Sequence, residues 1–137
     1  MASVREIDRD SNVKVGIRFP LDYSPDGFFY STKTVLEQSK SNIINLLLTQ
    51  KGERVMQPNF GTGLHSLLFE QMTDDFENKL TETITKSVGY WLPYINIEEV
   101  DIKMTDEMKD MHRADMNIKF TVGNQIETQE ITFRIQE

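Results

Sequence analysis

The chain lacks cysteine, has only two histidines and contains no long run of apolar residues. Without cysteine it cannot form a disulfide, a zinc–thiolate site, an iron–sulfur cluster or a cysteine nucleophile. Its apolar stretches fall short of the roughly 18 to 20 residues that span a bilayer, and residues 1–10 hold no signal-peptide core. We therefore expect folding in a cytoplasm-like compartment and no membrane partner.

Basic residues are also in the minority, because 15 Lys and Arg oppose 22 Asp and Glu, for a net charge of −7. Binding to a phosphate backbone needs a basic face, so this balance argues against a nucleic-acid partner. Residues 93–137 carry ten of the acids and five of the bases. We favour the interpretation that this acidic excess provides solubility and protects strand edges, and the alternative is that it steers the chain toward a basic partner.

Few residues suit catalysis. His65 and His112 have no ligand-spaced partner in sequence, and the HExxH and GxSxG motifs are absent. Glu53, Glu70 and Asp74 could supply a pair of hydrolase carboxylates. Acids are common in this chain, however, and Glu53 suits a turn while Asp74 suits a helix cap. We expect no enzyme, no metal and no cofactor.

The first helical segment covers residues 34–50, where apolar side chains recur at spacings of three and four. Thr32 or Thr34 can cap its start, since either hydroxyl can accept a bond from an unpaired backbone N–H. Gly52 suits a left-handed stop just beyond its end. We predict a long helix that is buried on more than one side.

Two further helices are predicted before residue 93. A short apolar face at residues 64–69 indicates a short helix. Thr73 and Asp74 are candidate caps of a second long helix, which Pro93 ends. Its apolar stripe comprises Phe76, Leu80, Ile84, Val88 and Trp91.

From residue 95 onward the apolar period changes to two, which is typical of half-buried strands. Alternating sets occupy residues 95–104, 114–122 and 131–135, separated by a polar connector at 105–113 and a hairpin signal at Gly123-Asn124. The predicted fold class is α+β: two long helices and a short helix pack on an antiparallel β-sheet formed mainly by the C-terminal third.

Residues 1–33 lack a helical period but hold many aromatic side chains and a Pro25-Asp26-Gly27 turn signal. We predict an N-terminal arm, 1–33, that packs on its own domain or on a neighbour. Residues 34–137 are then a single α+β domain.

A connector rich in glycine and proline follows the first helix. It reads Gly52-Glu53-Arg54-Val55-Met56-Gln57-Pro58-Asn59-Phe60-Gly61, followed by Gly63-Leu64. Glu53 and Arg54 either bind partner chains or lock the turn while Val55, Met56 and Phe60 enter the core. We favour the structural interpretation, because the Gly and Pro positions account for the local geometry directly.

This connector, together with Leu68-Phe69-Glu70, closely resembles the signature of the contractile-tail baseplate wedge family. That family includes the T-even phage wedge subunit twenty-five, the sheath initiators of simpler phages and pyocins, and a type VI secretion baseplate subunit. The likeness covers residues 16–137, and Gly16-Ile17-Arg18-Phe19-Pro20 is similar to the family's N-terminal segment. It implies a non-enzymatic structural protein of the virion tail baseplate, repeated in a sixfold baseplate and assembled in the host cytoplasm.

The resemblance also implies the partners. Family members clasp the wedge core-bundle subunits and seed the tail sheath protein, whose arms add strands to the initiator's sheet; tail tube or hub proteins are further candidates. We expect the accepting edge on the closing hairpin, with Ile131, Phe133 and Ile135 holding it to the core. Two alternatives stay open, a soluble regulatory anti-adapter-like module on the same fold and a cell-wall hydrolase.

One segment departs from the family pattern. Many members have Glu-Pro-Arg after the second long helix, where the charged pair grips the core bundle, but this chain has Leu92-Pro93-Tyr94. We expect Trp91, Leu92, Pro93 and Tyr94 to make that contact instead, with the phenol as a hydrogen-bonding group. The alternative, held equally, is that Leu92 and Tyr94 only pack locally.

Overall fold

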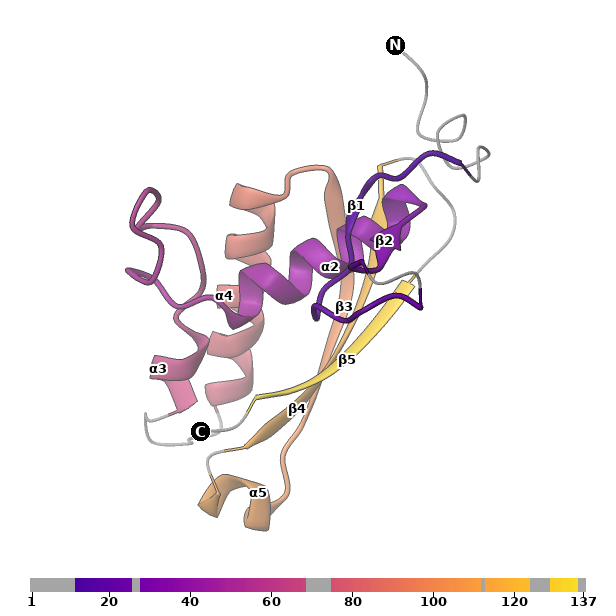
Figure 1. Ribbon diagram of the computed structural model, residues 1–137. Helices are drawn as coiled ribbons and strands as arrows, with labels where there is room; N and C mark the ends of the chain where they lie inside the picture. The colour runs from indigo at the N-terminus through magenta and orange to yellow at the C-terminus, as the bar shows by residue number, and fades with distance from the viewer. Residues whose placement is uncertain (1–11, 26–27, 69–74, 112, 124–128, 136–137) are drawn as a thin grey trace. The chain divides into compact units, whose positions relative to one another are not determined.

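An antiparallel sheet organises the C-terminal third of the chain, as the alternating pattern predicts. The computed structural model describes residues 12–25, 28–68, 75–111, 113–123 and 129–135. In it β3 (Ile95–Lys103), β4 (Ala114–Val122) and β5 (Gln129–Ile135) pair in the order β3-β4-β5 (Figure 1). Successive side chains of a strand point to opposite faces, and β4 accordingly buries every second one: Ala114, Met116, Ile118, Phe120 and Val122.

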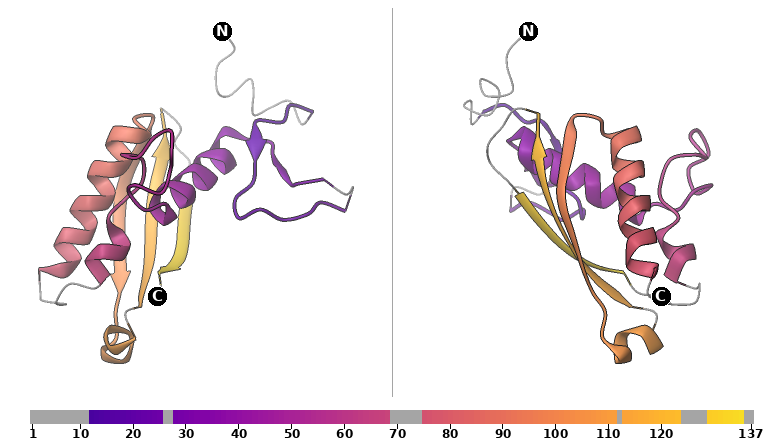
Figure 2. Two further views of the ribbon diagram at one scale, coloured as in Figure 1. Left: turned by 60° about the vertical axis from the view of Figure 1, so that its left-hand side comes forward. Right: turned by 180° about the vertical axis from the view of Figure 1, so that it is seen from behind.

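The helix α4 (Phe76–Trp91) packs on one face of this sheet, beside β3 (Figure 2). Its predicted stripe is confirmed for four members, since Phe76, Leu80, Ile84 and Val88 are buried, while Trp91 is half-buried. Burial of such side chains contributes about 1.5–3 kcal/mol each and is the main source of stability here. The predicted caps Thr73 and Asp74 lie outside the described residues.

The opposite face of the sheet carries charged pairs that cross between strands. Arg134 on β5 binds Asp115 on β4 through two bonds, of 2.6 and 3.1 Å, and Lys119 on β4 binds Glu99 on β3 at 2.6 Å. The hydrogen bond from Arg134 lowers the pKa of Asp115. Acids of this face are therefore balanced locally, which weakens the interpretation that they steer a basic partner.

The chain divides into two compact units, Met1–Asn45 and Leu46–Glu137, and α2 (Val35–Leu48) crosses the border. Within the first unit β1 (Gly16–Ile17) pairs antiparallel with β2 (Ser31–Thr32), and the Tyr23 and Phe29 rings stack at 5.5 Å. The described part of the arm therefore contains a short antiparallel strand pair, which the sequence pattern did not predict. The division into an arm, 1–33, and a domain, 34–137, stays a prediction.

Thr34 is the residue that caps α2. Its hydroxyl accepts the Glu37 N–H at 3.1 Å, and the Glu37 carboxylate accepts the Lys33 N–H at 3.1 Å, in the manner of a capping box. The Thr32 hydroxyl instead donates to Gln38 at 2.6 Å. The helix ends at Leu48, two residues before the predicted end.

The connector, residues 52–63, leads from α2 to α3 (Leu64–Leu68) and is closed by backbone bonds. The Gly52 N–H donates to the Pro58 carbonyl at 2.7 Å, and the Thr62 N–H donates to the Thr49 carbonyl at 2.9 Å. Gly61 has φ +113°, and a Cβ there would collide with the Thr49 carbonyl group. Only glycine fits this approach, because it has no Cβ and tolerates positive φ.

One short helix, α5 (Asp106–Asp110), lies in the segment predicted as a polar connector at 105–113. The Thr105 hydroxyl accepts the Met108 N–H at 3.3 Å, and two acids follow it in the first turn. A threonine before Asp and Glu is an N-terminal helix signal that the sequence interpretation overlooked. The α+β class itself is confirmed.

Replacing Gly61 tests the close approach to Thr49. Gly61→Ala should lower the free energy of unfolding by about 2 kcal/mol or more, since it combines positive φ with a backbone collision. Gly63→Ala is the matched control, because a Cβ at Gly63 meets nothing within 4 Å. Urea unfolding of both variants measures the difference, and equal stabilities would contradict the assignment.

The Asp115–Arg134 pair predicts a particular titration. In the folded protein the Asp115 pKa should lie below its ordinary value of 3.8, and Arg134→Gln should raise it toward that value. Because the folded pKa is the lower one, the pair's contribution to stability is present above 3.8 and is lost as the pH falls through the folded pKa. NMR titration of the Asp115 carboxyl in the parent protein and in Arg134→Gln measures this pKa. Identical titration curves would show that the Asp115–Arg134 pair does not form in solution.

Candidate partner interface

Glu53 locks the start of the connector. Its carboxylate accepts the Gln50 N–H at 2.9 Å, and its own N–H donates to the Gln50 carbonyl at 3.2 Å. Further along, the Phe60 N–H donates to the Gln57 carbonyl at 3.0 Å. These bonds support the turn-locking role of Glu53 that we favoured from sequence, and they close the turns at the two ends of the connector.

A row of stacked side chains joins the connector to the end of α4. The Arg54 guanidinium lies 3.9 Å from the centre of the Phe60 ring, which meets Trp91 edge to face at 5.1 Å. Trp91 in turn meets Tyr90 edge to face at 5.0 Å. Cation–π and edge-to-face contacts each contribute about 0.5–1.5 kcal/mol. The Arg54–Tyr90 row therefore fixes the connector on α4.

Val55 and Met56 form the exposed tip of the connector, and the prediction that they enter the core was wrong. Their exposed fractions are 94% and 92%. The bond between Gly52 and Pro58 closes the loop, Val55 and Met56 lie exposed at its tip, and half-buried Phe60 anchors the connector. Figures 1 and 2 show the connector on the side of α4 that faces away from the sheet.

An open pocket of about 420 Å³ lies between the connector and α4. Its walls are Lys51, Asn59 and Gly61 on one side and Lys86, Ser87, Tyr90 and Trp91 on the other. Lys86 pairs with Glu82 at 2.5 Å one turn earlier, and that bond lowers the Glu82 pKa. The charged side chains in the wall are both lysines, so the pocket suits a negatively charged group.

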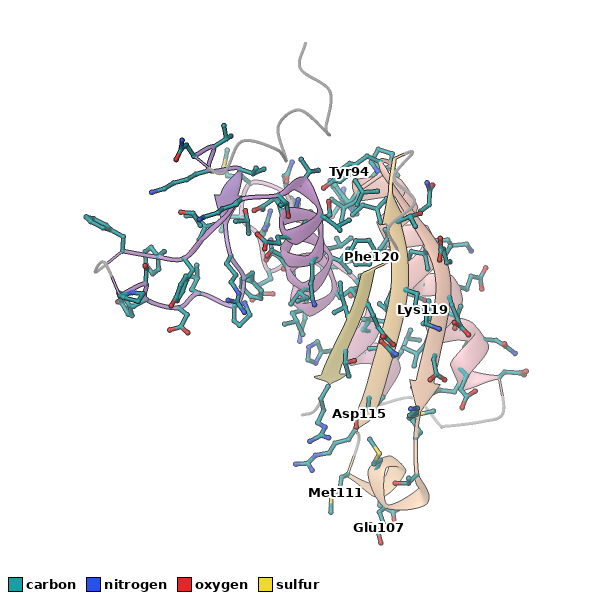
Figure 3. All side chains as sticks on the ribbon, turned by 90° about the vertical axis from the view of Figure 1, so that its right-hand side faces the viewer. Tyr94, Glu107, Met111, Asp115, Lys119 and Phe120 are labelled. Carbon is teal, nitrogen blue, oxygen red and sulfur yellow. The ribbon has the colours of Figure 1, made fainter. Side chains whose placement is uncertain are left out.

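The segment after α4 has a fixed backbone and partly exposed side chains. The Ile95 N–H donates to the Leu92 carbonyl at 3.0 Å, and the Gly123 N–H donates to the Tyr94 carbonyl at 2.9 Å. Leu92 is half-buried, Pro93 is exposed, and Tyr94 keeps 41% of its surface exposed. Figure 3 places Tyr94 at the end of the sheet opposite Glu107 and Met111.

The predicted residues thus fall in two places. The connector and Trp91 are brought together by the stacked row, and Leu92, Pro93 and Tyr94 follow directly in the chain. Ile131 lies apart from them, as a buried residue of β5. The side chains of Phe133 and Ile135 lie outside the described part of the structure, although their backbone belongs to β5.

Three residues of this surface were missed from sequence: Lys51, Lys86 and Tyr90. Tyr90 is 76% exposed at the last turn of α4, and its position one residue off the apolar stripe could have indicated this. The lysines carry no comparable signal. In the described ranges no group of three or more Asp, Glu or His side chains is placed to hold a metal ion, and none of the helices is long and apolar enough to cross a membrane.

The fold has counterparts among solved structures. A Geobacter sulfurreducens protein, assigned provisionally as a tail lysozyme, superposes with a TM-score of 0.67 at 22% identity, covering 77% of this chain and 93% of its own. A chain of the anti-feeding prophage baseplate gives 0.59 at 23% identity, with 85% and 82% covered. A chain of the type VI secretion baseplate complex gives 0.56 at 14% identity, with 74% and 93% covered. At these identities the likeness shows the fold alone.

The sequence itself gives the family. Comparison with curated proteins returned no match. Residues 35–130, by contrast, match the profile of the family described as baseplate wedge protein gp25. This match spans the two long helices, the connector and most of the sheet. The chain therefore belongs to the baseplate wedge protein gp25 family and is a structural protein of a contractile-tail baseplate.

Proposed function

We propose that this chain clasps the wedge core-bundle subunits with the end of α4 and initiates the tail sheath by accepting a strand on β5. The observation that carries the clasp is the row of Arg54, Phe60, Trp91 and Tyr90, which places an aromatic surface at the end of α4. Placement in a sixfold baseplate, with tail tube or hub proteins as neighbours, is part of the same proposal.

The clasp uses Trp91, Leu92, Pro93 and Tyr94 in place of the family's charged pair. Energetic hot spots of protein interfaces are rich in Trp, Tyr and Arg, because these side chains bury a large area with few rotatable bonds. Tyr94 is partly exposed on a backbone that two hydrogen bonds fix. Such a side chain offers a partner part of its ring without a large ordering cost.

The strand acceptor is β5 rather than β3, the other edge of the described sheet. The β3 edge is interrupted by a register shift between Ile97 and Glu99, and it carries exposed Glu98 and Asp101, whereas Glu99 binds Lys119 on β4. Bulges and edge charges are the devices that block strand pairing. On β5 the charged side chains turn inward across the sheet, where Arg134 binds Asp115 and Glu130 accepts from Asn117.

A structural role also accounts for one of the three acids that suggested a hydrolase. The Glu53 carboxylate is engaged by the Gln50 N–H, while Glu70 and Asp74 lie outside the described residues. The Geobacter sulfurreducens neighbour shares the fold at 22% identity, which does not transfer an activity. No observation favours the regulatory anti-adapter, and we propose that the chain is not an enzyme.

Truncating the clasp should weaken entry into the wedge. Leu92→Ala with Tyr94→Ala should reduce binding to the core-bundle subunits by about 30-fold, the effect of one or two hot-spot residues. Tyr94→Phe is the matched control for the phenol, because it keeps the ring. Pull-down of the co-expressed wedge subunits measures binding, and full binding by a folded double variant would show that Leu92 and Tyr94 only pack locally.

Single cysteines can locate the sheath strand, since the chain has none of its own. Asp101 on β3 and Thr132 on β5 both align with Asn117 on β4, so they occupy one row at opposite edges of the sheet. Thr132→Cys should crosslink to the sheath protein in assembled tails, and Asp101→Cys should not. A crosslink through Asp101→Cys alone would move the acceptor to β3, and none at either edge would argue against strand addition.

A further inference from the structure

The connector tip is an apolar surface presented on a rigid support. Val55 and Met56 are almost fully exposed, although transfer of such side chains out of water is favourable by about 1.5–3 kcal/mol each. The loop that carries them is closed by the Gly52–Pro58 bond and locked by Glu53. A loop already held in its bound conformation avoids the ordering cost of association, which is a property of binding surfaces.

The basic side chains of this surface are opposite in sign to the net charge of the chain. Lys51 and Lys86 line the pocket, and Arg54 stacks at its edge, whereas the whole chain has a net charge of −7. Two neighbouring acids are already engaged, Glu53 by Gln50 and Glu82 by Lys86. The Lys86–Glu82 pair is exposed on both sides and therefore weak, so Lys86 can turn to another carboxylate at little cost.

We infer that the connector tip and the lysine-lined pocket together bind a segment of another baseplate protein that carries carboxylates next to apolar side chains. The apolar side chains would cover Val55 and Met56, and the carboxylates would meet Lys51 and Lys86. This inference rests on the proposed function and adds to it a second contact, separate from Leu92 and Tyr94, with a defined partner chemistry. Methionine suits such a contact because its flexible thioether adapts to an irregular surface.

The apolar part is tested by removing both tip side chains. Val55→Ser with Met56→Ser should weaken binding to the wedge core complex, reconstituted without this chain, by about 10-fold or more. Thermal unfolding should be unchanged, because both side chains are exposed in the free protein. Met111→Ser is the matched control, because Met111 is 59% exposed at the end of the sheet opposite Tyr94, and it should bind like the parent protein (Figure 3).

The acidic part is tested by the sign of a charge at position 56. Met56→Lys and Met56→Glu lose the same apolar contact, but only the second repels an acidic partner. At low salt the lysine variant should bind about 5-fold more tightly than the glutamate variant, and the gap should narrow in 0.5 M salt. Lys51→Glu should weaken binding in the same salt-dependent way, whereas Lys103→Glu on β3 should not.

The outcomes separate this inference from the proposed function. If the parent protein does not join the core complex, the proposed function fails and the inference with it. If the parent joins and the serine variant joins equally well, only the inference fails. Equal binding by the two Met56 variants would exclude an acidic partner surface. Concentration-dependent self-association that the serine variant abolishes would assign the surface to a second copy of this chain and overturn the inference.

Discussion

The approach of the Gly61 backbone to the Thr49 carbonyl determines the path of the connector. A side chain at position 61 would collide there, so glycine alone lets the Thr62 N–H reach the Thr49 carbonyl, while the Thr62 hydroxyl donates to the Leu47 carbonyl in a buried bond of 2.9 Å. Phe60, the preceding residue, is thereby placed against Trp91. The placement of Phe60 in the stacked row and of Gly61 in the pocket wall both depend on this contact.

The exposed tip follows from the same geometry. The Gly52–Pro58 bond closes the loop, and Val55 and Met56 lie exposed at its tip. Beyond this loop the Phe60 ring packs against Trp91 on α4, and the Arg54 guanidinium lies over the Phe60 ring. An exposed apolar pair on a mobile loop would collapse onto the nearest surface, but a hydrogen-bonded loop keeps it presented to solvent. The hydrogen bonds that close this loop therefore also keep Val55 and Met56 exposed.

The sequence predicted best where the signal is periodic and local. The alternating burial of β4 and the burial of four stripe residues on α4 were both predicted correctly. Residues at these spacings lie on one face of a strand or helix, so they are buried together. Thr105 is an N-cap signal for α5, and the sequence interpretation overlooked it. At the site, the place of Glu53 in the turn was predicted correctly. The apolar character of Val55 and Met56 led to the wrong prediction that they enter the core. Hydropathy records a preference for burial, and it does not distinguish burial in a core from burial under a partner.

The two proposed contacts divide the work of assembly in a physically consistent way. Strand addition to β5 uses backbone groups, which every chain carries, so it supplies affinity with little choice of partner. The side chains at the connector and the end of α4 are specific in shape and charge, so they can select a partner that the sheet edge cannot. On the solvent face of the sheet Asp115 pairs with Arg134 and Lys119 pairs with Glu99, so these charges balance one another. The lysines of the pocket are therefore a distinct electrostatic feature. An assembly protein with one unselective edge needs such a selective surface, because otherwise the edge would accept any extended chain that it met.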